Sequence, residues 1–396
     1  MSIRLYRTES YGLNAYFRTA PSLISGSVKI QMKNEKYRSS ILPIFLFAGV
    51  VGALLFQCHT PEGNGRGAVK AVLETEDKQR GAHVFGRPDS TSFARFHEDN
   101  IEWVTLVPFG SQDDFDSPRV RHHNGDTLQI QYHDSSWTSQ IEIIRAAGFK
   151  VFFKPHVWIR HPSEGKWRSD VSHRNKEDWE AWKESYRSFI LRYARVAERA
   201  HAEMFCVGTE FTRLSAEKPD FWRELIRDVR KVYSGKITYA ANWYEEYDKV
   251  TFWDALDYIG IQAYFPLVEN RNPTVEQLSA GWNRHLPTIR AVREKFGKKV
   301  LFTEMGYKST EDSAIEPWEW IRRGQSNEER GYSLETQANC YQAFFDTIWD
   351  ADWFAGAHIW QLRVNSRRRR RQSSNLDFTP LDKPAEKVIA EGFERE

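Results

Sequence analysis

Cysteine is scarce in this chain, and neither sign of charge dominates. Three cysteines among 396 residues cannot build a disulfide framework, so the fold must be stabilised by its core. The 56 Lys and Arg residues balance 54 Asp and Glu residues, which leaves no global field to attract nucleic acid. The histidines are scattered without metal-ligand spacing, so we expect no metal and no cofactor. These absences exclude a disulfide-rich module and a nucleic-acid-binding protein.

Long apolar runs are lacking as well. The stretch at residues 41–56 is interrupted by Pro43 and is too short to span a bilayer comfortably. Basic residues precede it and Cys58 follows it, an order that is similar to a bacterial lipoprotein signal, in which the cysteine becomes lipidated. We therefore expect Cys58 to anchor the protein to the membrane of the bacterial cell envelope, on its periplasmic face or at the cell surface. An uncleaved membrane anchor and a buried helix are the alternatives.

This interpretation divides the N-terminal part of the chain. Residues 32–58 form the signal segment, and the polar, Gly-rich residues 59–79 form a flexible tether. Residues 1–31 have no role in this scheme, so we expect translation to start at Met32. The folded domain then spans residues 80–396, and its length suits one α/β barrel of about 250 residues or more.

Aromatic side chains are abundant, with 15 Trp, 16 Tyr and 25 Phe. Aromatic rings usually pack in a core, but Trp this frequent also suits a cleft in which rings stack against the apolar faces of sugars.

Strand-like apolar runs alternate with helical patterns from residue 81 onward. Trp, Tyr and Phe recur at helical spacing between residues 179 and 193, for example. The expected strands are 81–85, 102–108, 150–158, 203–210, 236–243, 258–265, 299–307 and 354–361. Eight strands that each lead into a crossover predict a (β/α)8 TIM barrel in a single catalytic domain. Residues 81–88 supply no glycine-rich phosphate loop, which disfavours an open doubly wound sheet. Residues 110–136 are irregular and are expected to form a long loop at the cleft.

Polar or aromatic residues end nearly every expected strand, and in such a barrel these ends converge on one face. Glu210 ends the fourth strand and Glu304 the seventh, on opposite sides of the barrel mouth. Two carboxylates facing one cleft are the minimum for glycosidic-bond hydrolysis, and a retaining enzyme places them about 5 to 5.5 Å apart. A lone glutamate would more often pair with a basic residue at the rim. Two glutamates at the ends of these two strands favour a catalytic role instead.

Several motifs then resemble one family in order and spacing. They are residues 154–158, 206–210, 238–243, 258–267 and 303–307, followed by 377–380 and 383–388. Together they resemble glycoside hydrolase family 113, whose characterised members are retaining endo-β-1,4-mannanases of clan A. The similarity covers residues 80–393 or so.

The resemblance implies roles for individual residues. Glu210 would be the acid/base and Glu304 the nucleophile, Tyr264 would donate a hydrogen bond to the nucleophile, and Trp360 would form the floor of the cleaved subsite. Both aromatic residues have an alternative as core residues. Clan A enzymes usually place Asn immediately before the acid/base to hold the sugar 2-hydroxyl, and Thr209 stands there instead. Since mannose and glucose differ at that carbon, another β-glycan, a glucan or an acidic polysaccharide, stays open as the substrate.

Position at strand ends adds further candidates for sugar contacts. They are Lys154, His156, Trp158, Asn242 and Trp243, each with an alternative as a rim or core residue. The block Arg367–Arg371 follows the last strand, and we expect it to be solvated, with contact to anionic polysaccharide or to lipid headgroups as the alternative. The partners we expect are a polysaccharide or oligosaccharide and a membrane, with no nucleic acid, and the protein is expected to be a monomer. A catalytically silent glycan-binding protein is the rival from another class.

Overall fold

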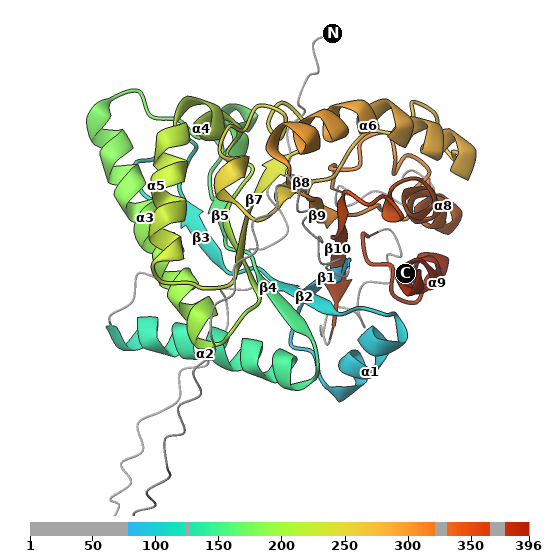
Figure 1. Cartoon of the computed structure of the whole chain (residues 1–396), viewed down its shortest axis with the longest axis horizontal. Helices are drawn as coiled ribbons and strands as arrows, with labels where there is room; N and C mark the ends of the chain where they lie inside the picture. Colours follow the sequence, from blue (N-terminus) through green and yellow to red (C-terminus); the bar gives the residue numbers. More distant parts are fainter. Residues whose placement is uncertain (1–77, 123–126, 321–330, 365–376, 396) are drawn as a thin grey trace, which may run out of the picture. The chain divides into compact units, whose positions relative to one another are not determined.

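A closed barrel of eight parallel strands forms the centre of the protein (Figure 1). The structure is a computed structural model that describes residues 78–122, 127–320, 331–364 and 377–395. Neighbouring strands follow the order β1-β10-β9-β8-β7-β6-β4-β2 around the barrel. Their bounds are Gln79–Phe85 (β1), Trp103–Leu106 (β2), Lys150–Phe153 (β4), Met204–Thr209 (β6), Lys236–Asn242 (β7), Ile259–Gln262 (β8), Val300–Met305 (β9) and Phe354–Arg363 (β10). The predicted (β/α)8 fold is confirmed.

Helices surround the barrel on its outside (Figure 1). They are α1 (Ser90–Glu98), α2 (Thr127–Ala146), α3 (Lys176–Arg199), α4 (Thr212–Glu217), α5 (Pro219–Arg230), α6 (Val275–Phe296), α8 (Leu334–Phe344), which continues as a π-helical turn over Phe345–Trp349, and α9 (Pro384–Glu394). Their ends follow ordinary capping chemistry. In α6, Thr274 and Gln277 form a capping box, and Gly297 ends the helix in the left-handed region at φ 64°.

The core has two layers, as a filled barrel requires. One lies between the strands and the surrounding helices and contains the largest buried rings, such as Trp182, Trp222 and Trp282. The other consists of buried side chains from the barrel strands and their ends. Its members are Trp103, Phe152, Met204, Cys206, Ala240, Tyr258, Leu301 and Ala355. The barrel is therefore a packed scaffold that can hold side chains rigidly at its mouth.

The third expected strand, residues 150–158, is two strands. β4 ends at Phe153, and β5 (His156–Ile159) pairs with β3 (Phe109–Gln112) in a separate two-stranded parallel sheet. Pro155 lies between them and has no N–H to donate to the barrel ladder, so the pairing changes there. The end of the second expected strand, at Pro108, shows the same interruption. Consequently Trp158 lies on the small sheet rather than on a barrel strand.

The expectation of an irregular loop over residues 110–136 is wrong in part. This segment includes β3 and the first ten residues of α2, which begins at Thr127. Its polar residues gave no clear helical periodicity, because α2 has exposed positions such as Tyr132 along much of its length.

The expected signal segment and nearly all of the tether lie outside the described residues, and so does the block Arg367–Arg371. β1 starts at Gln79, which the sequence had assigned to the tether. Within the described ranges, no helix combines the length and apolarity that crossing a membrane requires.

Candidate active site

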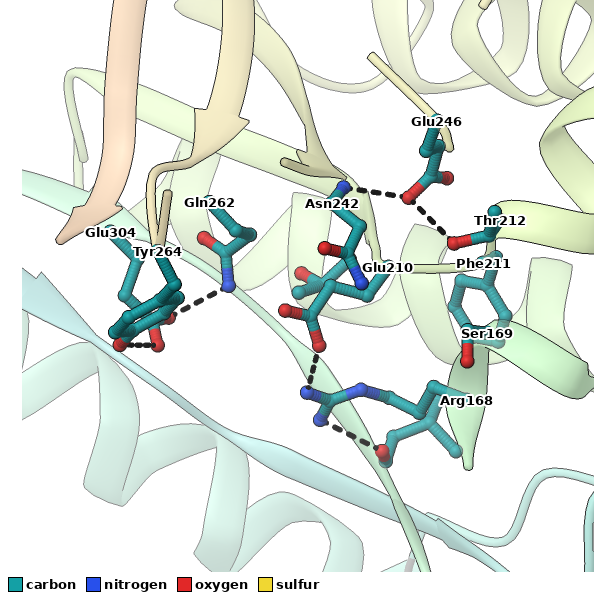
Figure 2. A network of polar contacts seen from close by, with 12 residues as sticks. Arg168, Ser169, Glu210, Phe211, Thr212, Asn242, Glu246, Gln262, Tyr264 and Glu304 are labelled. Carbon is teal, nitrogen blue, oxygen red and sulfur yellow. Dashed lines mark hydrogen bonds and ion pairs between the residues drawn. The ribbon is translucent and has the colours of Figure 1, made fainter. Parts of the chain in front are cut away.

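Glu304 lies in a cradle of donors at the mouth of the barrel. It is the penultimate residue of β9 and is only 6% exposed. The Tyr264 hydroxyl donates to Oε1 at 2.6 Å, and Gln262 Nε2 donates to Oε2 at 2.9 Å (Figure 2). Lys154 Nζ lies 2.8 Å from the same Oε2 and adds a full positive charge. Charge-assisted donors of this kind stabilise an anionic nucleophile and fix its orientation.

Lys154 is fully buried, which makes it a partner of Glu304 rather than an open contact for sugar. Its ammonium also donates to Gln262 Oε1 at 2.7 Å and to the Thr303 carbonyl at 3.2 Å. His83 Nε2 lies 3.4 Å from the ammonium and 3.8 Å from Glu304. Burial and the charge of Lys154 hold the pKa of His83 well below 6.5. The ring is therefore neutral, and Lys154 is the cation that balances Glu304.

Tyr264 follows β8 and is 7% exposed. Its pKa lies well above 10, first because the ring is buried and then because of the charge of Glu304 and the hydrogen bond to it. Glu210 contributes in the same direction, so both carboxylates act on this phenol. Tyr264 stays protonated and remains a donor to Glu304 across the working pH range.

Glu210 directly follows β6 and has a left-handed backbone, with φ 55°. Its amide donates to the Ala240 carbonyl at 2.9 Å, and its Oε2 accepts from Arg168 Nη2 at 2.6 Å. Arg168 is 7% exposed, donates to the Val157 carbonyl at 3.2 Å and stacks over the Trp167 ring at 5.1 Å. In the described part of the chain no other side chain donates to Glu210, so its Oε1 is available to a ligand.

Sequence patterns did not reveal Arg168. It belongs to a short 3-10 turn, Arg168–Asp170, in the connection between β5 and α3. The only available signal is general: this connection follows a strand end, and such connections form the catalytic face.

Two further candidates lie near Glu210. Asn242 lies beside it in Figure 2, with its Oδ1 accepting from the Tyr244 amide at 3.2 Å. Thr209 is 1% exposed, and its hydroxyl lies 3.9 Å from Cys206 Sγ. Thr209 is therefore almost completely enclosed, whereas Asn242 is part-exposed and lies next to Glu210.

Aromatic rings pack around Tyr264, the donor to Glu304. Trp360 packs in a cluster with Tyr264 and Phe378, and its ring centroid lies 5.1 Å from that of His83. Trp243 stacks on Trp318 at 5.1 Å. The Trp360–Gln361 peptide bond is cis.

On the small sheet, Trp158 meets Trp167 edge to face at 5.1 Å. His156 is 4% exposed, and its Nε2 has no hydrogen-bond partner among the described residues. Burial, with the charges of Lys154 and Arg168, holds its pKa well below 6.5. His156 is therefore a buried, neutral ring, and Trp158 and Trp167 form an aromatic pair next to Arg168. No group of three His, Cys, Asp or Glu side chains in the described ranges could hold a metal ion.

Known proteins match this architecture. The profile of Glycoside Hydrolase Family 113 matches residues 78–383. A solved GH113 β-1,4-mannanase complex is 27% identical, with a TM-score of 0.67 over 81% of this chain and 100% of that one. The GH113 β-mannanase AaManA from Alicyclobacillus acidocaldarius, in complex with ManMIm, is 30% identical, with a TM-score of 0.66 over 80% of this chain and 97% of that one.

More distant structures share the fold alone. A β-glucuronidase from Ruminococcus gnavus is 12% identical, with a TM-score of 0.52 over 80% of this chain and 50% of that one. Among curated protein sequences, none matches the chain. The family profile covers every strand of the barrel and both glutamates, so this protein belongs to glycoside hydrolase family 113 and is a glycoside hydrolase.

Proposed function

We propose that this protein is a retaining β-mannanase that hydrolyses β-1,4-linked mannan by double displacement. Glu304 attacks the anomeric carbon while Glu210 gives its proton to the leaving glycosidic oxygen, which breaks the bond and forms a covalent glycosyl-enzyme. Glu210 then takes a proton from water, which attacks the same carbon and releases Glu304. The observation that carries the proposal is the cradle of Lys154, Gln262 and Tyr264 around Glu304.

The two glutamates have different hydrogen-bond donors, which suit different catalytic roles. Glu304 receives donors on both oxygens, as a nucleophile that must stay ionised requires. Glu210 is held through one oxygen by Arg168, and its other oxygen can meet the leaving group. Trp360 beside Tyr264 offers a ring face to the sugar that reacts, and Trp158 with Trp167 lies on the side of Glu210.

The choice of mannan rests on the two β-mannanase structures at 27% and 30% identity. Another β-glycan is the second candidate, because Thr209 replaces the asparagine expected to hold the sugar 2-hydroxyl. Reducing ends released by residues 59–396 from a panel of β-linked polysaccharides would decide between them. Mannan should give the highest rate, and a higher rate on glucan or on an acidic polymer would overturn this choice.

The assignment of the glutamates has its own test. Glu304→Ala should abolish turnover, and azide should restore it with an inverted glycosyl azide as product, because a small anion can occupy the space of the missing nucleophile. Glu210→Ala should keep activity toward an aryl glycoside with a good leaving group, which needs no proton. Normal turnover by Glu304→Ala, measured by product release and NMR of the anomer, would refute the assignment. A wild-type protein that binds these glycans but hydrolyses none of them would instead support the alternative of a silent glycan-binding protein.

We also propose that the protein is a lipid-anchored component of the bacterial cell envelope, from the basic residues and apolar run that precede Cys58. Expressed from Met32 in a bacterium, the protein should appear in the membrane fraction and incorporate radiolabelled palmitate. Cys58→Ser should lose the label, whereas Cys340→Ser, in a buried thiol of the barrel domain, should keep it. Unlabelled wild-type protein in the cytosolic fraction would end the proposal.

A further inference from the structure

A buried carboxyl group that the proposed mechanism does not use lies behind Glu210. Glu246, in the loop after β7, is 0% exposed. Its Oε2 accepts from the Asn242 amide at 2.7 Å and from the Thr212 hydroxyl at 3.2 Å (Figure 2). Its Oε1 accepts from the Tyr239 hydroxyl at 2.5 Å. A buried carboxyl group needs such donors, because a buried polar or charged group without hydrogen-bond partners is strongly destabilising.

These donors lead directly to the backbone on the C-terminal side of Glu210. Tyr239 donates its proton to Glu246, and the same hydroxyl oxygen accepts from the Phe211 amide at 2.9 Å. Thr212, the next residue, begins α4. The two residues that follow Glu210 are therefore both held by Glu246, one directly and one through Tyr239.

The direction of the central hydrogen bond follows from the chemistry of Tyr239. Burial, and then the charge of Glu246, raise the pKa of this phenol well above 10. Tyr239 thus keeps its proton and can only donate it to the carboxyl oxygen. The ring itself packs against Trp222 and Phe252, so its position is set independently of its hydroxyl.

The backbone conformation of Glu210 needs this support. A non-glycine residue in the left-handed region, here at φ 55°, is strained and persists only when its surroundings hold it. On one side the Glu210 amide is tied to the Ala240 carbonyl. On the other side the chain is tied to Glu246. Released from this tie, residues 210–212 can relax toward an ordinary backbone conformation and carry the Glu210 carboxyl away from the cleft.

We propose that Glu246 is a positioning residue that holds the acid/base Glu210 in its reactive orientation, through Tyr239 and Thr212. Glu246 also holds the backbone amide of Asn242, which lies next to Glu210. This inference rests on the proposed function, since it assigns Glu246 to the step in which Glu210 transfers a proton. It differs from a role in stability alone, because it predicts a defect confined to proton transfer.

The test compares Glu246→Gln, which keeps the shape of the side chain, with Tyr239→Phe, which keeps the ring but removes the hydroxyl that links Glu246 to the Phe211 amide. On unactivated β-1,4-mannan, kcat should fall by roughly tenfold to a hundredfold in both variants, with KM within about twofold of wild type, because a misplacement of about 1 Å can cost a hundredfold. On a dinitrophenyl β-mannoside, azide should accelerate turnover and yield a retained β-mannosyl azide, since azide needs no general base.

Two controls make the result specific. Glu203→Gln removes a carboxylate immediately before β6, where it accepts from the amide of Val151 in β4 at 2.7 Å. This variant should behave as wild type on both substrates. Glu210→Ala should show the full defect and the same azide product. If Glu210→Ala shows neither, the assignment of Glu210 fails and this inference with it. A second outcome concerns Glu246 alone: Glu210→Ala shows the defect and the azide product, but Glu246→Gln and Tyr239→Phe do not. These two variants would then either match wild type, or lose activity equally on mannan and on the dinitrophenyl mannoside without acceleration by azide. Either result overturns the role of Glu246.

Discussion

At the scale of single residues, the environment of Glu304 is defined by one buried cation. Lys154 contacts Glu304, Gln262 and the Thr303 carbonyl, and its side chain is completely enclosed. A buried ammonium is unfavourable unless it is paired, so the lysine and the glutamate depend on each other. The position of Lys154 at a strand end suggested a contact with sugar, whereas the structure pairs this lysine with Glu304, the candidate nucleophile. Arg168 has the corresponding place beside Glu210, although nothing in the sequence singled it out.

The Lys154 pair leads to a kinetic prediction. Lys154→Met keeps most of the side-chain volume but removes the charge beside Glu304, so kcat on mannan should fall by on the order of a hundredfold, as for loss of one strong preorganised donor. Lys150→Met, four residues earlier on the exposed start of β4, should leave kcat unchanged. Steady-state kinetics on folded protein, verified by circular dichroism, would check both. A normal kcat for Lys154→Met would show that Gln262 and Tyr264 suffice.

At the scale of elements, close contact between strand ends determines where Trp360 lies. Gly306 directly follows β9, and a Cβ atom there would come within 2.2 Å of the Trp360 carbonyl oxygen on β10. This neighbour is backbone, which cannot move away as a flexible side chain could. The glycine therefore permits the close approach that places Trp360 beside Tyr264.

Gly306→Ala should consequently disturb both stability and activity. We expect the free energy of unfolding to fall by about 1 to 3 kcal/mol, as for an overpacked site, and kcat/KM on mannan to fall with it. Gly297→Ala is the matched control: its added Cβ meets nothing, and its left-handed φ of 64° should cost about 1 to 2 kcal/mol with no change in kcat/KM. Urea unfolding and initial rates would measure both quantities, and an equal kcat/KM in the two variants would contradict this explanation.

At the scale of the whole molecule, buried histidines couple stability to pH. His83, His156 and His358 all have pKa values well below 6.5, chiefly because of burial and, in each case, with a contribution from Lys154. The unfolded chain binds these protons below pH 6.5 and the folded chain does not, so stability falls as the pH drops below about 6.5, by about 1.4 kcal/mol per pH unit for each histidine. Glu246 acts in the opposite sense. Burial, partly offset by the hydrogen bonds it accepts, raises its pKa to about 7, so its contribution is lost as the pH rises from about 4.5 to 7.

The histidine effect can be isolated at His358, which lies inside the barrel between Thr105 and Gln79, at 2.7 and 3.0 Å. In His358→Gln, the fall of the unfolding free energy between pH 6.5 and 4.5 should be shallower than in wild type by about 1.4 kcal/mol per pH unit. His97→Gln is the control, because His97 is exposed on α1. Parallel pH profiles for wild type and His358→Gln, measured by urea unfolding, would refute the assignment of this slope to buried histidine.

Much of the architecture could be predicted because it is local. A buried parallel strand needs a short apolar run, and residues 204–209 and 300–305 satisfy this directly. The acidic residue at the end of each run then identified Glu210 and Glu304. The predictions failed where local pattern was weak: Pro155 splits one expected strand, and the polar start of α2 looked irregular.

The sequence alone determined the barrel and the family and singled out the two candidate glutamates, since strand spacing and motif order are properties of neighbouring residues. Only the tertiary structure decided which side chains meet: Lys154 with Glu304 across 150 residues, Arg168 with Glu210 across 42, and Glu246 with the backbone beyond Glu210. Such pairs depend on the register between strands and on the course of the connecting loops. Neither is encoded in the spacing of residues along one segment, because register is set by how separate strands pack together.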